Sequence, residues 1–197
     1  MVGAGNWGKN HIRVLNELGV LGGIVDKDES KLEYFGELYE KVELFSSLNS
    51  ALSSLFDGYV VSTPAETHFD ITRKIIENGH HVLVEKPLAM TVQDAEALKE
   101  LASSKNVNLM VGHLLLFHPA ILRIKRLINE KRIGKLQYIY SNRLNLGTVR
   151  TEENILWSFA PHDISIFQFI IGGFPQSLIC EGGIFLQPDV HDATMTI

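Results

Sequence analysis

The stretch Gly3-Ala4-Gly5-Asn6-Trp7-Gly8 decides the fold. In a glycine fingerprint of this spacing, the first glycine permits a tight turn, the second lets a pyrophosphate approach the backbone, and the third seats a helix. Apolar residues then recur at helical spacing through Leu15 and Leu18, and Gly19 offers a stop. The stretch therefore predicts a phosphate loop and a helix whose free amides and positive dipole end face an anion.

An acidic residue follows this loop at the distance expected for a dinucleotide site. The next predicted strand ends at Asp26, about 20 residues after the loop, where a carboxylate accepts hydrogen bonds from the adenosine ribose. A carboxylate there repels a 2′-phosphate, so NAD is favoured over NADP, while Lys27 keeps NADP open as an alternative. The competing interpretation is an ordinary turn at Asp26-Lys27-Asp28.

From residue 1 to about residue 112, short β-branched runs alternate with segments of helical period. This order predicts an α/β fold in which helices cover a doubly wound parallel sheet. Only Met1 and Val2 precede the glycine loop, so the first strand is either truncated or very short. The other strands are predicted at residues 20–26, 42–45, 58–62, 81–85 and 108–112.

Two helices of this region have readable starts. Thr67 and Thr91 are each followed three residues later by an aspartate. In this capping pattern a hydroxyl and a carboxylate satisfy the free amides of the first helical turn. Each helix then presents an apolar stripe, which is interpreted as core facing the sheet.

The pattern changes after Gly112, which predicts two domains, residues 1–117 and 118–197. The last strand-like run stops in the middle of an apolar alternation, so we expect the sheet of the second domain to be incomplete. The predicted elements are helices at residues 119–130 and 162–171 and strands at residues 136–144, 177–186 and 193–197.

Composition excludes several classes of partner. A net charge of -5 provides no basic field to gather phosphate backbones, so no nucleic acid is expected. The longest apolar stretch, residues 167–174, is far short of the roughly 20 residues that span a bilayer. Cys180 is the only cysteine and no signal peptide is recognisable, which predicts a reducing, cytoplasmic location. His113 and His118 have no settled third ligand, so no metal is expected.

Two tripeptides, Ser62-Thr63-Pro64 and Glu85-Lys86-Pro87, follow neighbouring predicted strands. They lie at the carboxyl edge of the sheet, where open α/β folds bind ligands. With the glycine loop and Gly112-His113, they resemble the Gfo/Idh/MocA oxidoreductases over nearly the whole chain. The resemblance implies a Rossmann domain joined to an α/β domain with an open, mainly antiparallel sheet. It also implies that both tripeptides and His68 bind the cofactor.

The resemblance further implies that Lys86 is the family lysine, which lies beside nicotinamide and substrate. An independent argument comes from the chemistry of alcohol oxidation, in which a hydride and a hydroxyl proton leave the substrate. A cation or base positioned at that oxygen lowers the barrier. The alternative is a surface lysine before a proline turn, which composition alone would favour.

A third motif is Leu156-Trp157-Ser158-Phe159-Ala160-Pro161-His162-Asp163-Ile164-Ser165. It resembles the family segment that ends with a catalytic histidine at the start of a helix, and His162 matches that histidine. The alternative is that His162 only caps the helix. The commoner family pattern has an aspartate where this chain has Ser158, which puts the usual carboxylate partner in doubt. Asp163 adjoins His162 and is the remaining candidate for an orienting group, although on a helix its side chain would point elsewhere.

The same motif is similar to a narrower branch, the 3-dehydrogenases of UDP-N-acetylglucosamine and its uronic acid. Arginine forks and amides near it can grip a diphosphate, a carboxylate or sugar hydroxyls. The alternative is that these residues form a solvent-exposed loop without a binding role. The expected substrate residues besides Lys86 and His162 are His118, Arg143, Asn145, Arg150, Asn154, Trp157 and Asp163.

These patterns favour an NAD-dependent oxidoreductase that oxidises a secondary hydroxyl of a nucleotide sugar. A related hypothesis replaces the substrate with a free polyol such as an inositol. A hypothesis from another class is a dinucleotide-binding regulatory protein without turnover. We also expect a homo-oligomer, because broad apolar faces of an open sheet are usually covered.

Overall fold

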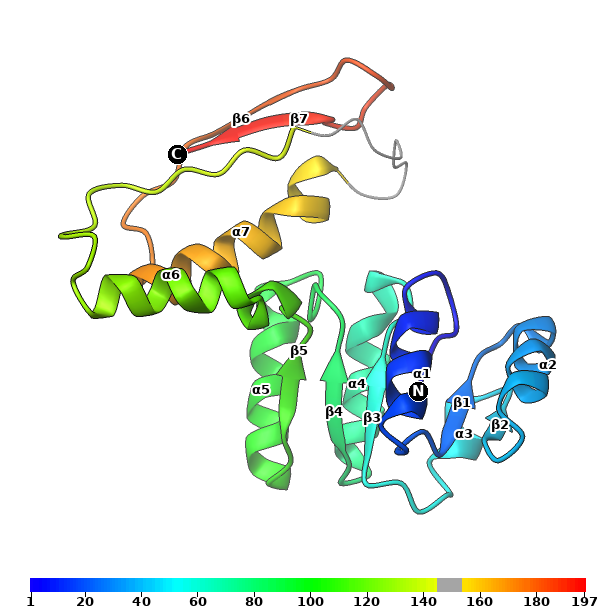
Figure 1. Cartoon of the computed structure of the whole chain (residues 1–197). Coiled ribbons are helices and arrows are strands. Elements are labelled where there is room, and N and C mark those ends of the chain that lie inside the picture. Colours follow the sequence, from blue (N-terminus) through cyan, green and yellow to red (C-terminus); the bar gives the residue numbers. More distant parts are fainter. Residues whose placement is uncertain (145–153) are drawn as a thin grey trace. The chain divides into compact units, whose positions relative to one another are not determined.

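The computed structural model describes residues 1–144 and 154–197. The chain divides into two compact units, Met1–Gly112 and His113–Ile197, and each is described by itself (Figure 1). Among the helices of the described ranges, none combines the length and the hydropathy that crossing a bilayer requires.

The first unit contains a parallel sheet. β1 pairs with β2, and β3 pairs with β4 and then β5, all in parallel. Val2 joins the two groups because it bridges Val25 on one side and Val61 on the other. The predicted first strand is therefore reduced to this one bridging residue, and the glycine loop leaves from the middle of the sheet. The strands are β1 Gly23–Val25, β2 Glu43–Phe45, β3 Gly58–Val61, β4 His81–Val84 and β5 Leu109–Val111.

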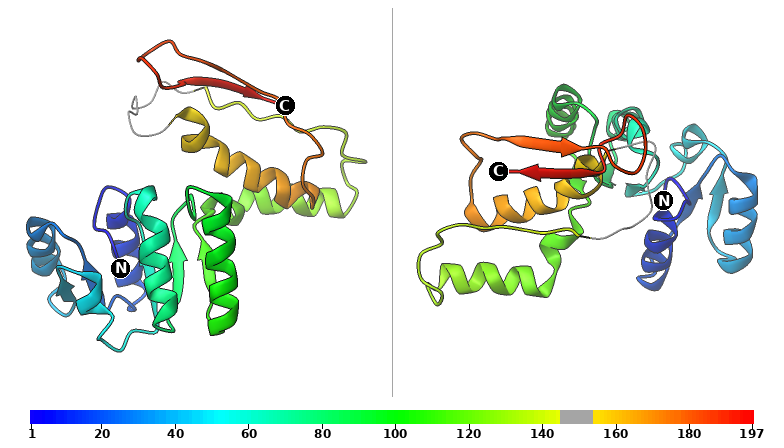
Figure 2. Two further views of the ribbon diagram at one scale, coloured as in Figure 1. Left: turned by 180° about the vertical axis from the view of Figure 1, so that it is seen from behind. Right: turned by 90° about the horizontal axis from the view of Figure 1, so that it is seen from above.

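Helices cover both faces of this sheet. Figure 2 shows α1 and α2 on one face and α4 and α5 on the other. This arrangement confirms the predicted doubly wound α/β fold, and the predicted strands all contain the observed ones. The helices are α1 Gly8–Glu17, α2 Glu29–Leu38, the short α3 Leu48–Ala51, the 3₁₀ turn η1 Ala65–Thr67, α4 His68–Glu77 and α5 Val92–Lys105.

Two hydrophobic clusters hold the layers together, one on each face. The first includes Ile12 of α1 and Ile24 of β1, both fully buried, with Leu32 and Phe35 of α2. The second joins α4 and α5 to the strands, and its fully buried members include Ile75, Ile76, Val61, Val84 and Leu98. Because both faces are sealed, a polar ligand must approach the sheet from an edge.

The two predicted helix caps differ in outcome. At Thr91 the backbone is extended and the hydroxyl accepts a hydrogen bond from the Asp94 amide at 3.1 Å, as predicted. At Thr67 the prediction is wrong, because the hydroxyl donates back to the Pro64 carbonyl at 2.7 Å. The reason is the 3₁₀ turn η1, which places Thr67 in helical backbone, whereas a capping residue needs extended backbone.

The second unit contains helices and a short antiparallel ribbon in which β6 pairs with β7. The helix predicted from residue 162 begins seven residues earlier, at Ile155, because the Asn154 side chain caps it and the helix continues through Pro161. The strand predicted at residues 136–144 is absent from those residues. The elements are η2 Leu114–Phe117, α6 Pro119–Asn129, α7 Ile155–Ile171, β6 Cys180–Gly183 and β7 Ala193–Thr196.

The Thr91 cap is testable. We expect Thr91→Ala to lower the free energy of unfolding by about 1 kcal/mol, because one amide of the first turn loses its acceptor. Thr91→Ser keeps the hydroxyl and should stay close to the wild type. Urea unfolding followed by circular dichroism measures both variants. Equal losses in the two variants would contradict the capping role.

Candidate functional site

The glycine loop is tightly packed at its first and third glycines and open at its second. A Cβ on Gly3 would lie 2.6 Å from the Ser62 carbonyl oxygen, and Gly3 has φ +90°, which disfavours any side chain. A Cβ on Gly8 would lie 2.0 Å from the Gly3 carbonyl oxygen. A Cβ on Gly5 would meet nothing within 4 Å. The loop thus lies against the Ser62 loop and leaves open space at Gly5.

Asp26 fastens the glycine loop to the end of β1. Its carboxylate accepts the Ala4 amide at 2.7 Å and the Asp28 amide at 3.0 Å. The Lys31 ammonium nitrogen lies 3.7 Å away. The structure therefore brings the predicted acid to the predicted loop. A carboxylate has about four acceptor positions, so these bonds leave room for a ribose hydroxyl.

Glu85 lies at the end of β4 and receives bonds from the start of α1. The Trp7 indole nitrogen donates to Oε1 at 2.7 Å, and the His11 Nε2 lies 2.7 Å from the same oxygen. The Lys86 amide donates to Oε2 at 3.2 Å. A Cβ on Gly112 would lie 3.0 Å from the carboxylate, so a glycine there leaves it room.

The charge of Glu85 follows from these contacts. Burial by itself raises the pKa of the Glu85 carboxyl, but the hydrogen bonds from His11 and Trp7, the attraction of His11 and the Lys86 amide together lower it. The carboxylate is therefore ionised at neutral pH although only 7% of the residue is exposed. It links the glycine loop to the strand end that carries Lys86.

His11 is a residue of this site that sequence reasoning missed. A signal did exist, because Trp7 and His11 are four residues apart and side chains at this spacing share one helical face. The carboxylate of Glu85, which both contact, lies 78 residues after Trp7 and 74 after His11, so only the folded chain brings them together.

His68 was predicted to bind the cofactor, but its ring is buried among backbone atoms. Nδ1 lies 2.6 Å from the Pro87 carbonyl oxygen, and Nε2 lies 2.9 Å from the Thr63 carbonyl oxygen. Only 1% of the residue is exposed. The ring therefore links the loop after β3 to the loop after β4. Lys86 is half-buried. Its neighbours Glu85 and Pro87 both make the hydrogen bonds described above.

In the second unit, His162 lies within α7 and is half-buried, so it does not cap the helix as one alternative had it. Ser158 is one helical turn before it, on the same face. Asp163, the expected orienting group, contacts other residues. Its carboxylate accepts the Ser141 hydroxyl at 2.7 Å and forms an ion pair with Arg143. Side chains of adjacent helical residues point to different faces, which separates Asp163 from His162.

Two of the other expected substrate residues are helix caps. Asn154 caps α7 through the Trp157 amide at 3.1 Å, and His118 caps α6 through the Ala120 amide at 3.2 Å. Trp157 is 37% exposed. The remaining two, Asn145 and Arg150, lie outside the described residues. Within the described ranges, no group of three or more metal-ligating side chains is found.

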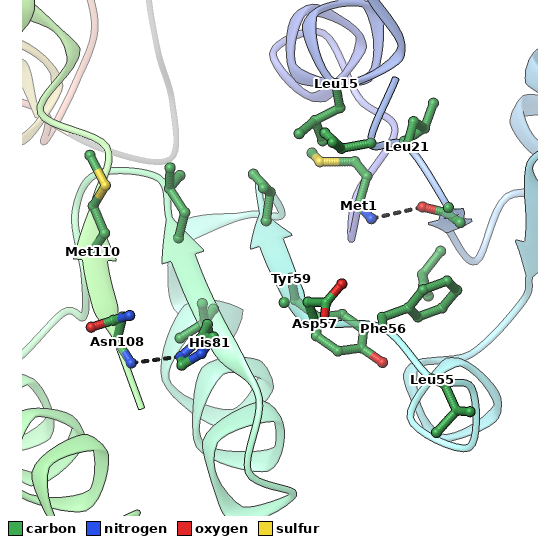
Figure 3. A pocket seen from close by; sticks show the side chains of 18 residues that line it. Met1, Leu15, Leu21, Leu55, Phe56, Asp57, Tyr59, His81, Asn108 and Met110 are labelled. Carbon is green, nitrogen blue, oxygen red and sulfur yellow. Dashed lines mark hydrogen bonds between the residues drawn. The ribbon is translucent and has the colours of Figure 1, made fainter. Parts of the chain in front are cut away.

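A pocket of about 580 Å³ lies at the amino ends of the strands, away from this site (Figure 3). Its lining includes Leu21, Phe56, Tyr59, His81 and Met110, and it contains no residue of the glycine loop or of the two tripeptides. Because parallel strands present their amino and carboxyl ends at opposite edges, this pocket is not part of the candidate site.

Comparison with known proteins places the first unit in a family. A family model, GFO_IDH_MocA, described as an oxidoreductase family with an NAD-binding Rossmann fold, matches residues 1–113. Among solved structures, the WlbA dehydrogenase of Bordetella pertussis in complex with NADH and UDP-GlcNAcA superimposes with a TM-score of 0.84 at 20% identity. That match covers 99% of this chain and 64% of the other, and it shows the fold.

Curated relatives carry different activities. UDP-N-acetylglucosamine 3-dehydrogenase of Acidithiobacillus ferrooxidans is 25% identical over 100% of this chain and 62% of its own length. Inositol 2-dehydrogenase of Rhizobium meliloti is 22% identical over 98% and 60%. A 2,7-anhydro-N-acetylneuraminate hydratase of Mediterraneibacter gnavus is 28% identical over 72% and 41%. The chain thus spans less than two thirds of the length of each of these relatives.

Because Gly5 faces open space, a substitution there is expected to affect NAD binding without affecting stability. We expect Gly5→Ala to change the free energy of unfolding by no more than about 0.5 kcal/mol, because its Cβ meets open space. The same methyl would occupy the approach of a pyrophosphate, and NAD affinity should fall at least about tenfold. Thermal unfolding and quenching of tryptophan fluorescence by NAD measure the two effects.

Gly3→Ala is the matched control for that experiment. It should cost about 1–2 kcal/mol of stability from the positive φ alone, before the clash with Ser62 is added. If Gly5→Ala destabilised the protein as much as Gly3→Ala, the open space at Gly5 would not be real.

The Glu85 contacts predict a pH-dependent contribution to stability. The folded pKa of Glu85 is below the ordinary value of 4.5, so its contribution is present above pH 4.5 and is lost as the pH falls through the folded pKa. Glu85→Gln should therefore lower the free energy of unfolding by about 1.5–3 kcal/mol at pH 7. Urea unfolding between pH 7 and pH 3 should show the difference from wild type closing. A difference that stays constant would refute the ionised contact.

Proposed function

The chain belongs to the Gfo/Idh/MocA family of oxidoreductases with an NAD-binding Rossmann fold, and from this premise we propose that it is an NAD-dependent dehydrogenase of a nucleotide sugar. One observation carries the proposal: the glycine loop contacts both Asp26, through the Ala4 amide, and Glu85, through the Trp7 indole. A phosphate loop, an acid suited to ribose and the strand end of Lys86 are therefore held together at one edge of the sheet.

The residues of this edge fit a dinucleotide. Open space at Gly5 and the free amides at the start of α1 suit a pyrophosphate without a basic side chain. Asp26 suits the two free ribose hydroxyls of NAD and disfavours the 2′-phosphate of NADP. The exposed Lys27 and the nearby Lys31 act in the opposite direction, so both cofactors belong in the assay.

The proposed chemistry is oxidation of a secondary hydroxyl to a ketone. NAD, when bound, supplies the acceptor for the hydride that leaves the carbinol carbon. The His162 imidazole takes the hydroxyl proton as general base. The Lys86 ammonium group stabilises the negative charge that develops on the same oxygen. Ser158 stands where a carboxylate partner of His162 would be, and it offers a hydroxyl on the same helical face.

The substrate we propose is a UDP-N-acetylhexosamine or its uronic acid, oxidised at C3. The motif of residues 156–165 and the alignment of the whole of this chain with 62% of the Acidithiobacillus enzyme support this choice. Arg143 is committed to Asp163, so substrate contact through this arginine has to use nitrogens other than Nε. Oxidation of an inositol is the second candidate, because the Rhizobium relative aligns with 98% of the chain.

Lys86→Met tests the catalytic role. With NAD and either UDP-N-acetylglucosamine or its uronic acid, we expect the rate of NAD reduction, followed by absorbance at 340 nm, to fall by about 10²–10⁴-fold. NAD affinity should stay within about threefold, because the phosphate loop is intact. Lys105→Met, on the exposed end of α5, is the matched control and should keep full activity.

Two results would overturn the assignment. Undiminished turnover in Lys86→Met would remove the lysine from the mechanism. Turnover of myo-inositol by the wild type, without turnover of either UDP-sugar, would replace the substrate.

A further inference from the structure

We propose that His11 and His68 are positioning residues that hold the backbone of Lys86 from its two sides. The inference rests on the proposed function, because it concerns the lysine assigned to catalysis there. Neither histidine is proposed to touch the substrate.

On the amino side of Lys86, His11 acts through Glu85. The imidazole Nε2 lies 2.7 Å from Glu85 Oε1, and the other carboxylate oxygen, Oε2, accepts the Lys86 amide at 3.2 Å. Trp7 donates to Oε1 as well, so one carboxylate joins the first turn of α1 to the lysine backbone.

On the carboxyl side, His68 holds the residue that follows the lysine. Its Nδ1 lies 2.6 Å from the Pro87 carbonyl oxygen and its Nε2 lies 2.9 Å from the Thr63 carbonyl oxygen. His68 is the first residue of α4, and α4 packs against β3 and β4. The Pro87 carbonyl is thereby fixed to the rigid core of the sheet.

These two contacts matter because lysine is a long, flexible side chain. Its ammonium group can return to one place only if the backbone that carries it does not move. A displacement of about 1 Å at a catalytic group can cost about 100-fold in rate, even when binding is unaffected. The contacts of His11 and His68 fall on the residues immediately before and after Lys86, where they restrict its backbone most directly.

Four substitutions and one control test the proposal by kinetics. His11→Leu and His68→Leu remove the contacts, while His11→Gln and His68→Gln keep an amide donor. We expect each leucine variant to lower kcat by about 10–100-fold, with the Kd for NAD changed by less than about threefold. His11→Gln should recover most of the rate, because its amide nitrogen can replace Nε2 at Glu85; His68→Gln can replace one of two contacts and should recover less.

His81→Leu is the matched control. His81 also contacts a backbone group, the Asn108 amide at 3.0 Å, but it lies at the amino edge of the sheet. A merely structural role for His11 and His68 would give all three leucine variants similar losses of stability and similar kinetics. Equal kcat values in the three variants would overturn the proposal, and so would unchanged kcat in the first two.

Hydrogen exchange at the Lys86 amide, measured by NMR, does not depend on turnover. We expect the exchange rate at this amide to rise at least about tenfold in His11→Leu and in His68→Leu, while the Val84 amide in β4 keeps its wild-type rate. If the wild type turns over none of the sugars, the proposed function fails but this measurement still decides the positioning role. Unchanged exchange at Lys86 in both variants would refute it.

Discussion

The parallel pairing of Val2 with both Val25 and Val61 is the constraint on which the first unit depends. This one residue joins β1 to β3 and turns two small groups of strands into one sheet. It also decides where the glycine loop begins, because Gly3 follows it directly. The loop therefore emerges at the middle of the carboxyl edge, between the strand end that carries Asp26 and the loop of Ser62.

Around that position, polar side chains form hydrogen bonds within the protein as well as facing the candidate ligand site. Asp26 uses its carboxylate on the Ala4 amide, and Glu85 is shared by Trp7, His11 and the Lys86 amide. Buried polar groups of this kind are costly unless satisfied, so each bond also restricts the conformation of the loop that makes it. The candidate site is thus built from loops whose positions are determined before any ligand arrives.

In the second unit too, contacts between residues distant in the sequence decide the structure where local sequence signals do not. The sequence predicted that a helix begins at residue 162, directly after Pro161. Asn154 caps the helix earlier, and α7 accommodates the proline inside. Asp163 is next to His162 in the sequence, yet its carboxylate contacts Ser141 and Arg143, which lie 22 and 20 residues earlier in the chain.

What the sequence by itself determined was local: the glycine loop with its helix, the alternation of strands and helices, and the strand ends that carry Asp26 and Lys86. These are determined by periodicity and by the conformational needs of glycine, and parallel strands necessarily bring their carboxyl ends to one edge. Only the tertiary structure decided that His11 shares a carboxylate with Trp7, and that His68 binds the Thr63 and Pro87 carbonyls instead of presenting its ring to a ligand. Such hydrogen bonds join residues far apart in the chain, and their short range and strict geometry leave no periodic trace in the sequence.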